Sequence, residues 1–292
     1  MPLTLAPHRA RRAASCVALL ALVLAGCSAP ANTDSSRDHG TAGAAPGQGL
    51  PSEHVHGVAF NAADDKVYLA THDGLFRYDQ SGPVRVGPVI DLMGFTAAGP
   101  NHFYSSGHPG PGVKMANPVG LIESTDAGQT WSTLSREGQS DFHTLTASQA
   151  GVVGYDGTAV LSTADGQSWT TLEPPVDTFA LAVSPDGSTL LATSQAGPAL
   201  SPDGGATWSV DPQAPLLQLA FFSDDRSVVG VAPDGSVFLS TDGGATWDQR
   251  GTVGHAPQAV TARAQPNGEL EILVVIESAI LRSTDSGITF TE

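Results

Sequence analysis

The chain has 292 residues and a formal net charge of −16, from 13 Lys and Arg against 29 Asp and Glu. This charge disfavours nucleic acid and anionic lipid headgroups as partners and favours cations. Its two cysteines, Cys16 and Cys27, both lie near the start of the sequence. No disulfide is therefore expected in the folded part.

The first 26 residues are typical of an export signal. A basic start with Arg9, Arg11 and Arg12 precedes an apolar run, residues 13–25, which is too short to span a bilayer stably. The run leads into Leu-Ala-Gly-Cys at residues 24–27, which resembles the lipobox of bacterial lipoproteins. The resemblance implies that Cys27 becomes a lipid-modified N-terminus on the extracytoplasmic face of the cell membrane. The alternative is an ordinary cleaved signal, which also exports the chain.

Residues 27–52 are small, polar and rich in Gly, Pro and Ser. Such a segment cannot bury enough apolar surface to fold, so we expect a flexible tether that starts at the lipidated Cys27. The folded domain is then expected over residues 53–292. The lipid anchor would be its only link to the membrane.

An eight-residue phrase recurs through the folded part. The copies are STDAGQTW from Ser124, STADGQSW from Ser162, SPDGGATW from Ser201, STDGGATW from Ser240 and STDSGITF from Ser283. Successive copies start 38, 39, 39 and 43 residues apart. A period near 40 indicates stacked supersecondary units. A weaker match over residues 70–82, without the final aromatic residue, brings the number of units to six. We call this sequence the repeated phrase.

Each unit is predicted to contain four short antiparallel strands separated by turn signals. In the fourth unit the strands are expected over residues 178–184, 188–194, 198–201 and 208–212. No segment has a helical periodicity long enough to compete. Six such units predict an all-β protein, a six-bladed β-propeller with four-stranded antiparallel blades. Closure is expected by packing between the first and last units rather than by a strand swapped between them.

The repeated phrase follows the pattern Ser-x-Asp-x-Gly-x-Thr-Trp and resembles the Asp-box, or BNR, repeat of sialidase-like and sortilin-like propellers. We expect a structural role, because Asp accepts N–H bonds within its own turn, Gly takes a positive φ and the aromatic ring packs between sheets. The copy at Ser162 departs from the pattern, with Ala164 in the Asp position. The structural residues are Asp126, Trp131, Trp169, Asp203, Trp208, Asp242, Trp247, Asp285 and Phe290.

The resemblance also implies an alternative function, an exo-sialidase-like glycoside hydrolase. The family's early Arg-Ile-Pro motif is absent, and no arginine is predicted at a channel entrance. Asp91, Asp141 and Asp177 remain candidates for a carboxylate pair of another glycosidase mechanism. Asp-box propellers also include receptors and assembly factors that catalyse nothing, so protein–protein interaction or envelope assembly is a further alternative. Catalytic residues cannot be named from the sequence.

A propeller is expected to bind ligands at one mouth of its central channel, where the first strands of the blades begin. Alignment of the six first strands gives two positions that point to the same side of each strand. The first position holds His54, Asp91, Asp141, Asp177, Leu216 and Gln258, and the second holds His56, Met93, His143, Phe179, Gln218 and Val260. Loops on the same face add His72 in the first unit, and His108 and Met115 in a 16-residue insertion of the second.

Imidazole, carboxylate and thioether groups that converge on one rim are what a transition-metal site requires. His with Met favours copper, and His with Asp favours zinc. The candidate ligands are His54, His56, His72, Asp91, Met93, His108, Asp141 and His143, with His56, His143 and Met93 at the centre.

Two other interpretations stay open, namely hydrogen bonding of these histidines to neighbouring loops and a site for an organic ligand. The chain is expected to be a monomer, with a small ligand, a glycan or an envelope protein as its partner.

Overall fold

The computed structural model describes residues 49–79 and 81–292. The predicted export signal, Cys27 and most of the predicted tether lie outside the described residues. The chain divides into two units, Met1–Ala42 and Gly43–Glu292, and all described residues belong to the second. No helix in this described part is long and apolar enough to cross a membrane.

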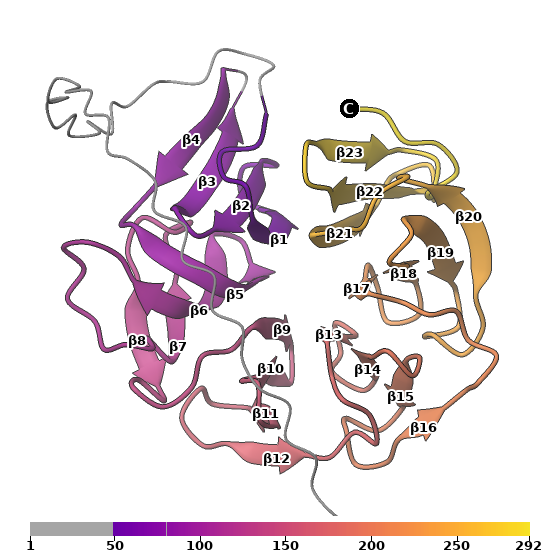
Figure 1. The fold of residues 1–292 in the computed structure, drawn as a ribbon, viewed down its shortest axis with the longest axis horizontal. Coiled ribbons are helices and arrows are strands. Elements are labelled where there is room, and N and C mark those ends of the chain that lie inside the picture. The colour runs from indigo at the N-terminus through magenta and orange to yellow at the C-terminus, as the bar shows by residue number, and fades with distance from the viewer. Residues whose placement is uncertain (1–48, 80) are drawn as a thin grey trace, which may run out of the picture. The chain divides into compact units, whose positions relative to one another are not determined.

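The described residues form six antiparallel sheets, which are the blades of a β-propeller (Figure 1). Blade 1 contains β1 (Val55–Phe60), β2 (Val67–Thr71), β3 (Gly74–Asp79) and β4 (Gly82–Val86). Blade 2 contains β5 (Ile90–Gly99), β6 (His102–Pro109), β7 (Leu121–Ser124) and β8 (Ser132–Ser135). Blade 3 contains β9 (Thr144–Ser148), β10 (Gly151–Tyr155), β11 (Val160–Thr163) and β12 (Thr170–Leu172).

The second half of the propeller repeats this organisation. Blade 4 contains β13 (Ala180–Val183), β14 (Leu190–Thr193), β15 (Ala199–Ser201) and β16 (Ser209–Val210). Blade 5 contains β17 (Leu219–Phe222), β18 (Val228–Val231), β19 (Ser236–Ser240) and β20 (Asp248–Thr252). Blade 6 contains β21 (Ala259–Ala264), β22 (Leu270–Val275) and β23 (Ile280–Ser283).

The first strand of every blade is the innermost one. Each of these strands contacts its counterpart in the next blade, and β21 contacts β1, so the ring is closed. The predicted all-β, six-bladed propeller is confirmed. Blade 6 differs in detail from a full four-stranded blade, because its outermost strand is reduced to an isolated bridge between Arg282 and Thr291.

The ring closes by packing between blades 1 and 6, as predicted from the sequence. Strand β1 pairs with β2 of its own blade, and no strand is exchanged. Val55 and Leu69 of blade 1 belong to one buried cluster with Leu273 of blade 6. The Gln258 side chain ties the seam, because its Oε1 accepts from the Val55 N–H at 3.0 Å and its Nε2 donates to the Glu53 carbonyl at 3.2 Å.

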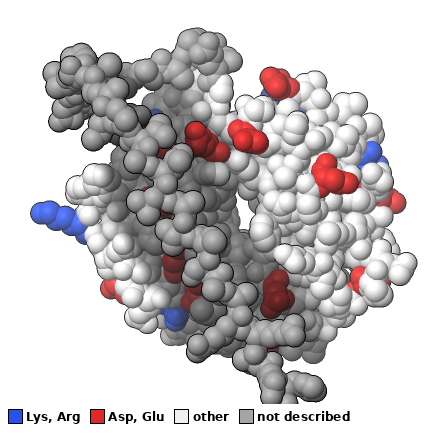
Figure 2. All heavy atoms as spheres, viewed as in Figure 1, with Lys and Arg blue, Asp and Glu red and all other residues white. Residues whose placement is uncertain are grey.

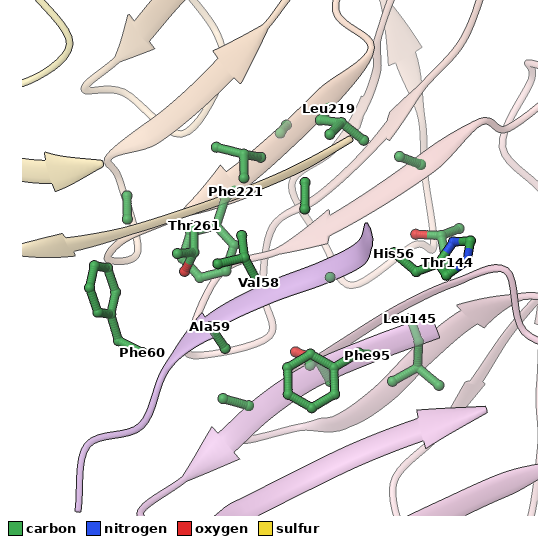
Figure 3. A pocket seen from close by; sticks show the side chains of 18 of the residues that line it. His56, Val58, Ala59, Phe60, Phe95, Thr144, Leu145, Leu219, Phe221 and Thr261 are labelled. Carbon is green, nitrogen blue, oxygen red and sulfur yellow. The ribbon is translucent and has the colours of Figure 1, made fainter. Parts of the chain in front are cut away.

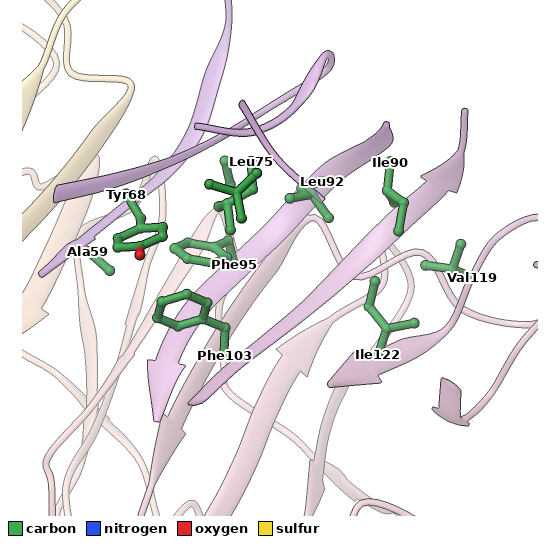
Figure 4. Packing of buried hydrophobic residues seen from close by; sticks show 11 residues of the cluster. Ala59, Tyr68, Leu75, Ile90, Leu92, Phe95, Phe103, Val119 and Ile122 are labelled. Atoms are coloured by element: carbon green, nitrogen blue, oxygen red, sulfur yellow. The ribbon is translucent and has the colours of Figure 1, made fainter. Parts of the chain in front are cut away.

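Aromatic and aliphatic side chains fill the space between neighbouring blades. Between blades 1 and 2, the rings of Tyr68 and Phe95 lie 5.1 and 5.3 Å from the ring of Phe103 (Figure 4). Trp131 of the repeated phrase packs against the same cluster. Each large apolar side chain buried in this way contributes about 1.5–3 kcal/mol to stability.

The repeated phrase forms the turn between the third and fourth strands of blades 2 to 5, as predicted. In its first copy, Ser124 Oγ accepts from the Gly128 N–H at 2.8 Å. Asp126 accepts from the Thr130 N–H at 2.9 Å and from the Thr130 hydroxyl at 2.6 Å. Gly128 has a φ of 84°, a backbone conformation that residues with a Cβ atom rarely adopt. The phrase is therefore a self-contained turn, and its aromatic residue packs on the blade.

The other copies of the phrase use the same hydrogen bonds, with one shift of register. Asp203, Asp242 and Asp285 accept from the threonine four residues later, as Asp126 does. In the copy at Ser162, Asp165 accepts from the N–H groups of Gln167 and Ser168 at 2.8 and 2.7 Å. The displaced aspartate therefore still closes its turn.

Candidate functional site

The innermost strands of blades 1 and 2 carry matching irregularities at the channel mouth, where these strands begin. The pairing of β1 with β2 shifts register between Val55 and Gly57, and that of β5 with β6 shifts between Leu92 and Gly94. His56 and Met93 are thus the extra residues of two β-bulges. A bulge turns a side chain away from the regular alternation of its strand.

The channel beneath the mouth is a cavity of about 410 Å³. Its wall is mainly apolar, with Val58, Phe95, Leu145 and Phe221 among the lining residues (Figure 3). His56 lines one end of this cavity beside Thr144. A space-filling view shows the opening at the centre of the ring of blades (Figure 2). His56 is therefore available to a molecule in the channel and to groups on the rim.

Three donor groups from blades 1 and 2 converge at the mouth. His56, His72 and Asp91 each present one ligand atom, and these atoms lie within 4.8 Å of one another. His56 Nε2 lies 3.2 Å from Nε2 and 3.4 Å from Nδ1 of His72, and His72 Nδ1 lies 2.8 Å from Asp91 Oδ1. We call these three residues the first triad.

The turn between β2 and β3 fixes the position of His72. Thr71 is fully buried, and its hydroxyl donates to the Gly74 carbonyl at 2.9 Å and accepts from the Asp73 N–H at 3.1 Å. His72 is held at the tip of this turn with its side chain 41% exposed. The first triad can therefore be reached from solvent on the side of His72.

The electrostatic surroundings keep His56 neutral. Burial, followed by the neighbouring His72, lowers the pKa of His56 to about 4. A neutral imidazole keeps a lone pair on one ring nitrogen, which is the form that binds a metal ion. At neutral pH, His56 is therefore chemically ready to act as a ligand.

A second group of donors lies on blades 2 and 3. His108 Nε2 is 3.2 Å and His143 Nε2 is 3.5 Å from the same atom, Asp141 Oδ2. We call His108, Asp141 and His143 the second triad. It adjoins the first triad, because His108 on β6 is the direct cross-strand partner of Asp91 on β5.

Close approach of β5 and β6 at this point requires glycine. A Cβ on Gly107 would lie 1.9 Å from the Asp91 carbonyl oxygen, and Gly107 has a φ of 139°. Gly107 precedes His108 and faces the start of the bulge at Met93. The sequence around His108 is thus shaped to bring the two strands, and their polar side chains, together.

The other predicted ligand His54 and the methionines Met93 and Met115 lie outside the two triads. The ring of His54 is 5.6 Å from that of His72, so it borders the first triad. Met93 occupies the bulge of β5, whereas Met115 packs against the hydrophobic cluster of blades 1 and 2. His102 is not among the predicted ligands; it lies at the other end of β6, where it pairs with Glu123 at 2.7 Å.

Polar groups at the mouth of blades 5 and 6 have a different role. Gln218 Nε2 donates to the Pro257 carbonyl at 2.8 Å, and Gln258 bonds to Val55 and Glu53. The backbone register also makes Gln258, and not Val260, the equivalent of Gln218, since the N–H of each bonds to the last residue of the neighbouring strand. These amides join one blade to the next.

Two residues of the site were not singled out from the sequence. Asn117 accepts a hydrogen bond from His108 Nδ1 at 2.6 Å, and Ser106 Oγ accepts from the Phe142 N–H at 3.0 Å. Both belong to the insertion of blade 2, whose unusual length was the one available signal. Their partners depend on how the insertion folds back, which the sequence pattern does not encode.

No family model and no curated protein matches this chain. Solved structures share its fold. A GH74 xyloglucanase from Xanthomonas campestris aligns with a TM-score of 0.59 and 14% identity over 84% of this chain, which spans 38% of that enzyme. YCF48 from Cyanidioschyzon merolae aligns with a TM-score of 0.54 and 15% identity, over 81% of this chain and 97% of that one.

A structure of YCF48 bound to a D1 peptide aligns with a TM-score of 0.51 and 18% identity, over 83% of each chain. At these identities the likeness shows the fold alone. β-Propellers host unrelated activities on one architecture, so function has to be argued from the site.

Proposed function

We propose that this chain is a ligand-binding propeller that holds a divalent transition-metal ion of the zinc type at its channel mouth, through His56, His72 and Asp91. The observation that carries the proposal is the convergence of these three donor atoms within 4.8 Å. Ligand atoms of a tetrahedral zinc ion lie about 3.4 Å apart, given bonds of about 2.0–2.1 Å. His56 Nε2 already has about this spacing from either ring nitrogen of His72, at 3.2 Å from Nε2 and 3.4 Å from Nδ1.

The donor set favours zinc over copper. It consists of two imidazoles and one carboxylate, a combination that zinc accepts and that leaves a fourth position open for water or another ligand. Copper sites more often recruit thioether sulfur. Met115 is partly buried and packs against the hydrophobic cluster of blades 1 and 2.

A purely structural role explains less of this geometry. Other junctions between blades are joined by one or two side-chain hydrogen bonds, such as Leu181 N–H to Thr144 Oγ1 and the Thr193 hydroxyl to the Gln218 carbonyl. The His72–Asp91 bond alone would join blades 1 and 2 in the same way. The neutral His56, turned toward His72 by a bulge, adds a donor that such a junction does not need.

The metal proposal is tested by calorimetry with Zn²⁺ on the full chain. Wild type should bind with a Kd below about 10 μM, and a His56→Ala/His72→Ala double variant should lose at least about 100-fold in affinity, close to 3 kcal/mol. His102→Ala, at the other end of β6, is the matched control and should bind like wild type. Binding weaker than about 10 μM, or equal binding by the double variant, would contradict the proposal.

We also propose that the chain is exported and anchored through Cys27, and that its repeated phrase places it with Asp-box propellers. The support is the basic start, the apolar run and the Leu-Ala-Gly-Cys sequence at residues 24–27. Cys27→Ser should abolish incorporation of labelled fatty acid and leave an unprocessed precursor. Retention of label in this variant would refute the anchor.

A second candidate function is recognition of a protein segment at the apolar side of the mouth. Phe179 is 57% and Leu216 is 47% exposed, and they precede the innermost strands of neighbouring blades 4 and 5. Exposed aromatic and aliphatic groups of this kind are enriched in binding surfaces. YCF48, a propeller of the same fold, has been solved with a bound peptide. A Phe179→Ser/Leu216→Ser variant should lose affinity for apolar peptides and keep zinc binding.

Glycoside hydrolysis is less well supported. Such enzymes require a pair of free carboxyl groups about 5–10 Å apart across the substrate. Of the three candidate carboxylates, Asp91 lies 2.8 Å from His72 and Asp141 lies 3.2 Å from His108, so two are engaged by histidines, and the third, Asp177, is exposed on the loop before β13. We therefore place ligand binding before catalysis.

A further inference from the structure

The cavity beneath the channel mouth presents almost no net charge. Among the residues that line it, only His56 and Arg263 have ionisable side chains. His56 is neutral at neutral pH, because burial lowers its pKa to about 4. Arg263 pairs with Glu271 at 2.7 Å and with Asp65, and its guanidinium lies over the ring of Phe60. A charged group inside the cavity would therefore lose its hydration without gaining a partner.

One polar side chain of the cavity wall lacks a partner. Thr261 on β21 lines the cavity and is only 2% exposed (Figure 3). Its hydroxyl makes no hydrogen bond with any other described residue. Buried polar groups are normally paired, because an unpaired one has lost its hydration without replacement. The Thr261 hydroxyl therefore calls for a partner inside the cavity that it borders.

A second hydroxyl lies at the mouth end of the cavity. Thr144 lies beside His56, and its Oγ1 accepts from the Leu181 N–H at 3.2 Å. The hydroxyl proton has no acceptor among the described residues, so Thr144 can also donate a hydrogen bond. The rest of the wall is mainly apolar, with side chains such as Leu145 and Phe221. The cavity thus offers isolated hydrogen-bond donors within an apolar surface.

The size of the cavity fits a small molecule. Its volume of about 410 Å³ lies within the range of about 300–1,000 Å³ that is usual for small-molecule sites. Such sites combine an apolar lining with a few polar groups that fix the orientation of the ligand.

We propose that the channel cavity binds an uncharged, mainly apolar organic molecule whose carbonyl or ether oxygen accepts a hydrogen bond from the Thr261 hydroxyl. The apolar body of this molecule lies against the aliphatic and aromatic wall. The inference goes beyond the proposed metal site and does not depend on it, because His72 and Asp91 do not line the cavity.

The test uses prodan, a neutral naphthalene ketone whose fluorescence shifts to shorter wavelength in apolar surroundings. The full chain should bind prodan with a Kd below about 100 μM and with blue-shifted emission. Thr261→Val keeps the shape of the side chain and removes the hydroxyl, so the affinity should fall about fivefold. Thr146→Val is the matched control, because Thr146 has the corresponding place in β9 but does not line the cavity. This control should bind like wild type.

A stability measurement separates ligand binding from a structural role of Thr261. Thr261→Val replaces an unpaired buried hydroxyl by a methyl group of similar size. The ligand-free variant should therefore unfold at the same denaturant concentration as wild type or at a higher one. A clear loss of stability would show that the protein itself satisfies this hydroxyl, and would overturn the inference.

The remaining outcomes distinguish this inference from the metal proposal. His72→Ala should weaken zinc binding and keep prodan binding, so either proposal can fail alone. Equal prodan affinity in Thr261→Val would overturn the inference, as would equally tight binding of the anionic dye anilinonaphthalene sulfonate. Prodan binding that is lost in Phe179→Ser/Leu216→Ser and kept in Thr261→Val would place the probe on the exposed apolar side chains of the mouth, and would also overturn it.

Discussion

The outer turns and the channel mouth differ in how their residues repeat from blade to blade. In the outer turns, the repeated phrase places the same residue types in successive blades, and the same hydrogen bonds follow from Asp126, Asp203, Asp242 and Asp285. At the mouth, corresponding positions differ from blade to blade. Blades 1 to 3 supply histidines and aspartates, whereas Gln218 joins blade 5 to blade 6 and Gln258 joins blade 6 to blade 1.

This difference separates stability from binding. The blades of a propeller are built alike and need similar stabilising contacts, so structural residues recur with the period of the fold. A ligand site is asymmetric and needs each donor once. Residues that break the repeat at corresponding positions are therefore better candidates for function than the most conspicuous repeated ones.

The largest expected effect concerns the outer turns. Trp247 packs beside Leu191 and Val228, and its Nε1 donates to the Gly244 carbonyl at 3.1 Å. Trp247→Ala should lower the free energy of unfolding by about 3 kcal/mol, the lower end for large aromatic truncations, because the ring is only partly buried. Chemical denaturation measures the loss, and Trp247→Phe should recover part of it. A change in the zinc affinity of the folded variant would contradict a purely structural role for Trp247.

A smaller effect is expected at the seam between blades 6 and 1. Gln258→Ala removes two hydrogen bonds, to Val55 and Glu53, each with a net contribution of about 1 kcal/mol. The free energy of unfolding should fall by about 1–2 kcal/mol with zinc binding retained. Gln149→Ala, at an exposed turn, is the matched control. Loss of zinc binding without loss of stability would assign Gln258 to the site and contradict its structural role at the seam.

The smallest effect is the acid response of the outer turns. Hydrogen bonds from the Thr289 side chain and backbone lower the pKa of Asp285 to about 2. Because the folded pKa lies below the unfolded value, its stabilisation is present above about pH 4 and is lost as the pH falls toward 2. Asp285→Asn should flatten the dependence of stability on pH in that range. An unchanged slope would show that the hydrogen bonds of Asp285 do not contribute.

Much of the fold could be predicted because each blade is specified by residues that are close together in the sequence. The period near 40 and the turn residues of the phrase from Ser240 indicate blades and their number directly. The reduced outer strand of blade 6 was not predicted, because the repeated phrase from Ser283 matches as well as the others. Whether the residues after it form a strand or only the bridge at Thr291 depends on pairing that the pattern does not specify.

The sequence predicted which face of the propeller carries the site, but not which side chains contact one another there. Histidines and aspartates were placed at the mouth by strand alignment, yet the pairing of His72 with Asp91 crosses two blades. The bulges at His56 and Met93 each insert one residue into a strand, which reverses the direction of a side chain without changing the period noticeably. Met115 turned inward because the insertion folds onto the core.

The most direct measurement is anomalous diffraction at the zinc absorption edge from crystals of the zinc-loaded protein. The account predicts a peak bonded to His56, His72 and Asp91 at about 2.0–2.2 Å, the distances usual for nitrogen and oxygen ligands of zinc. A zinc peak bound elsewhere, or no peak among these three side chains in protein that has bound zinc in solution, would contradict the claim that the unrepeated residues of the mouth form the functional site.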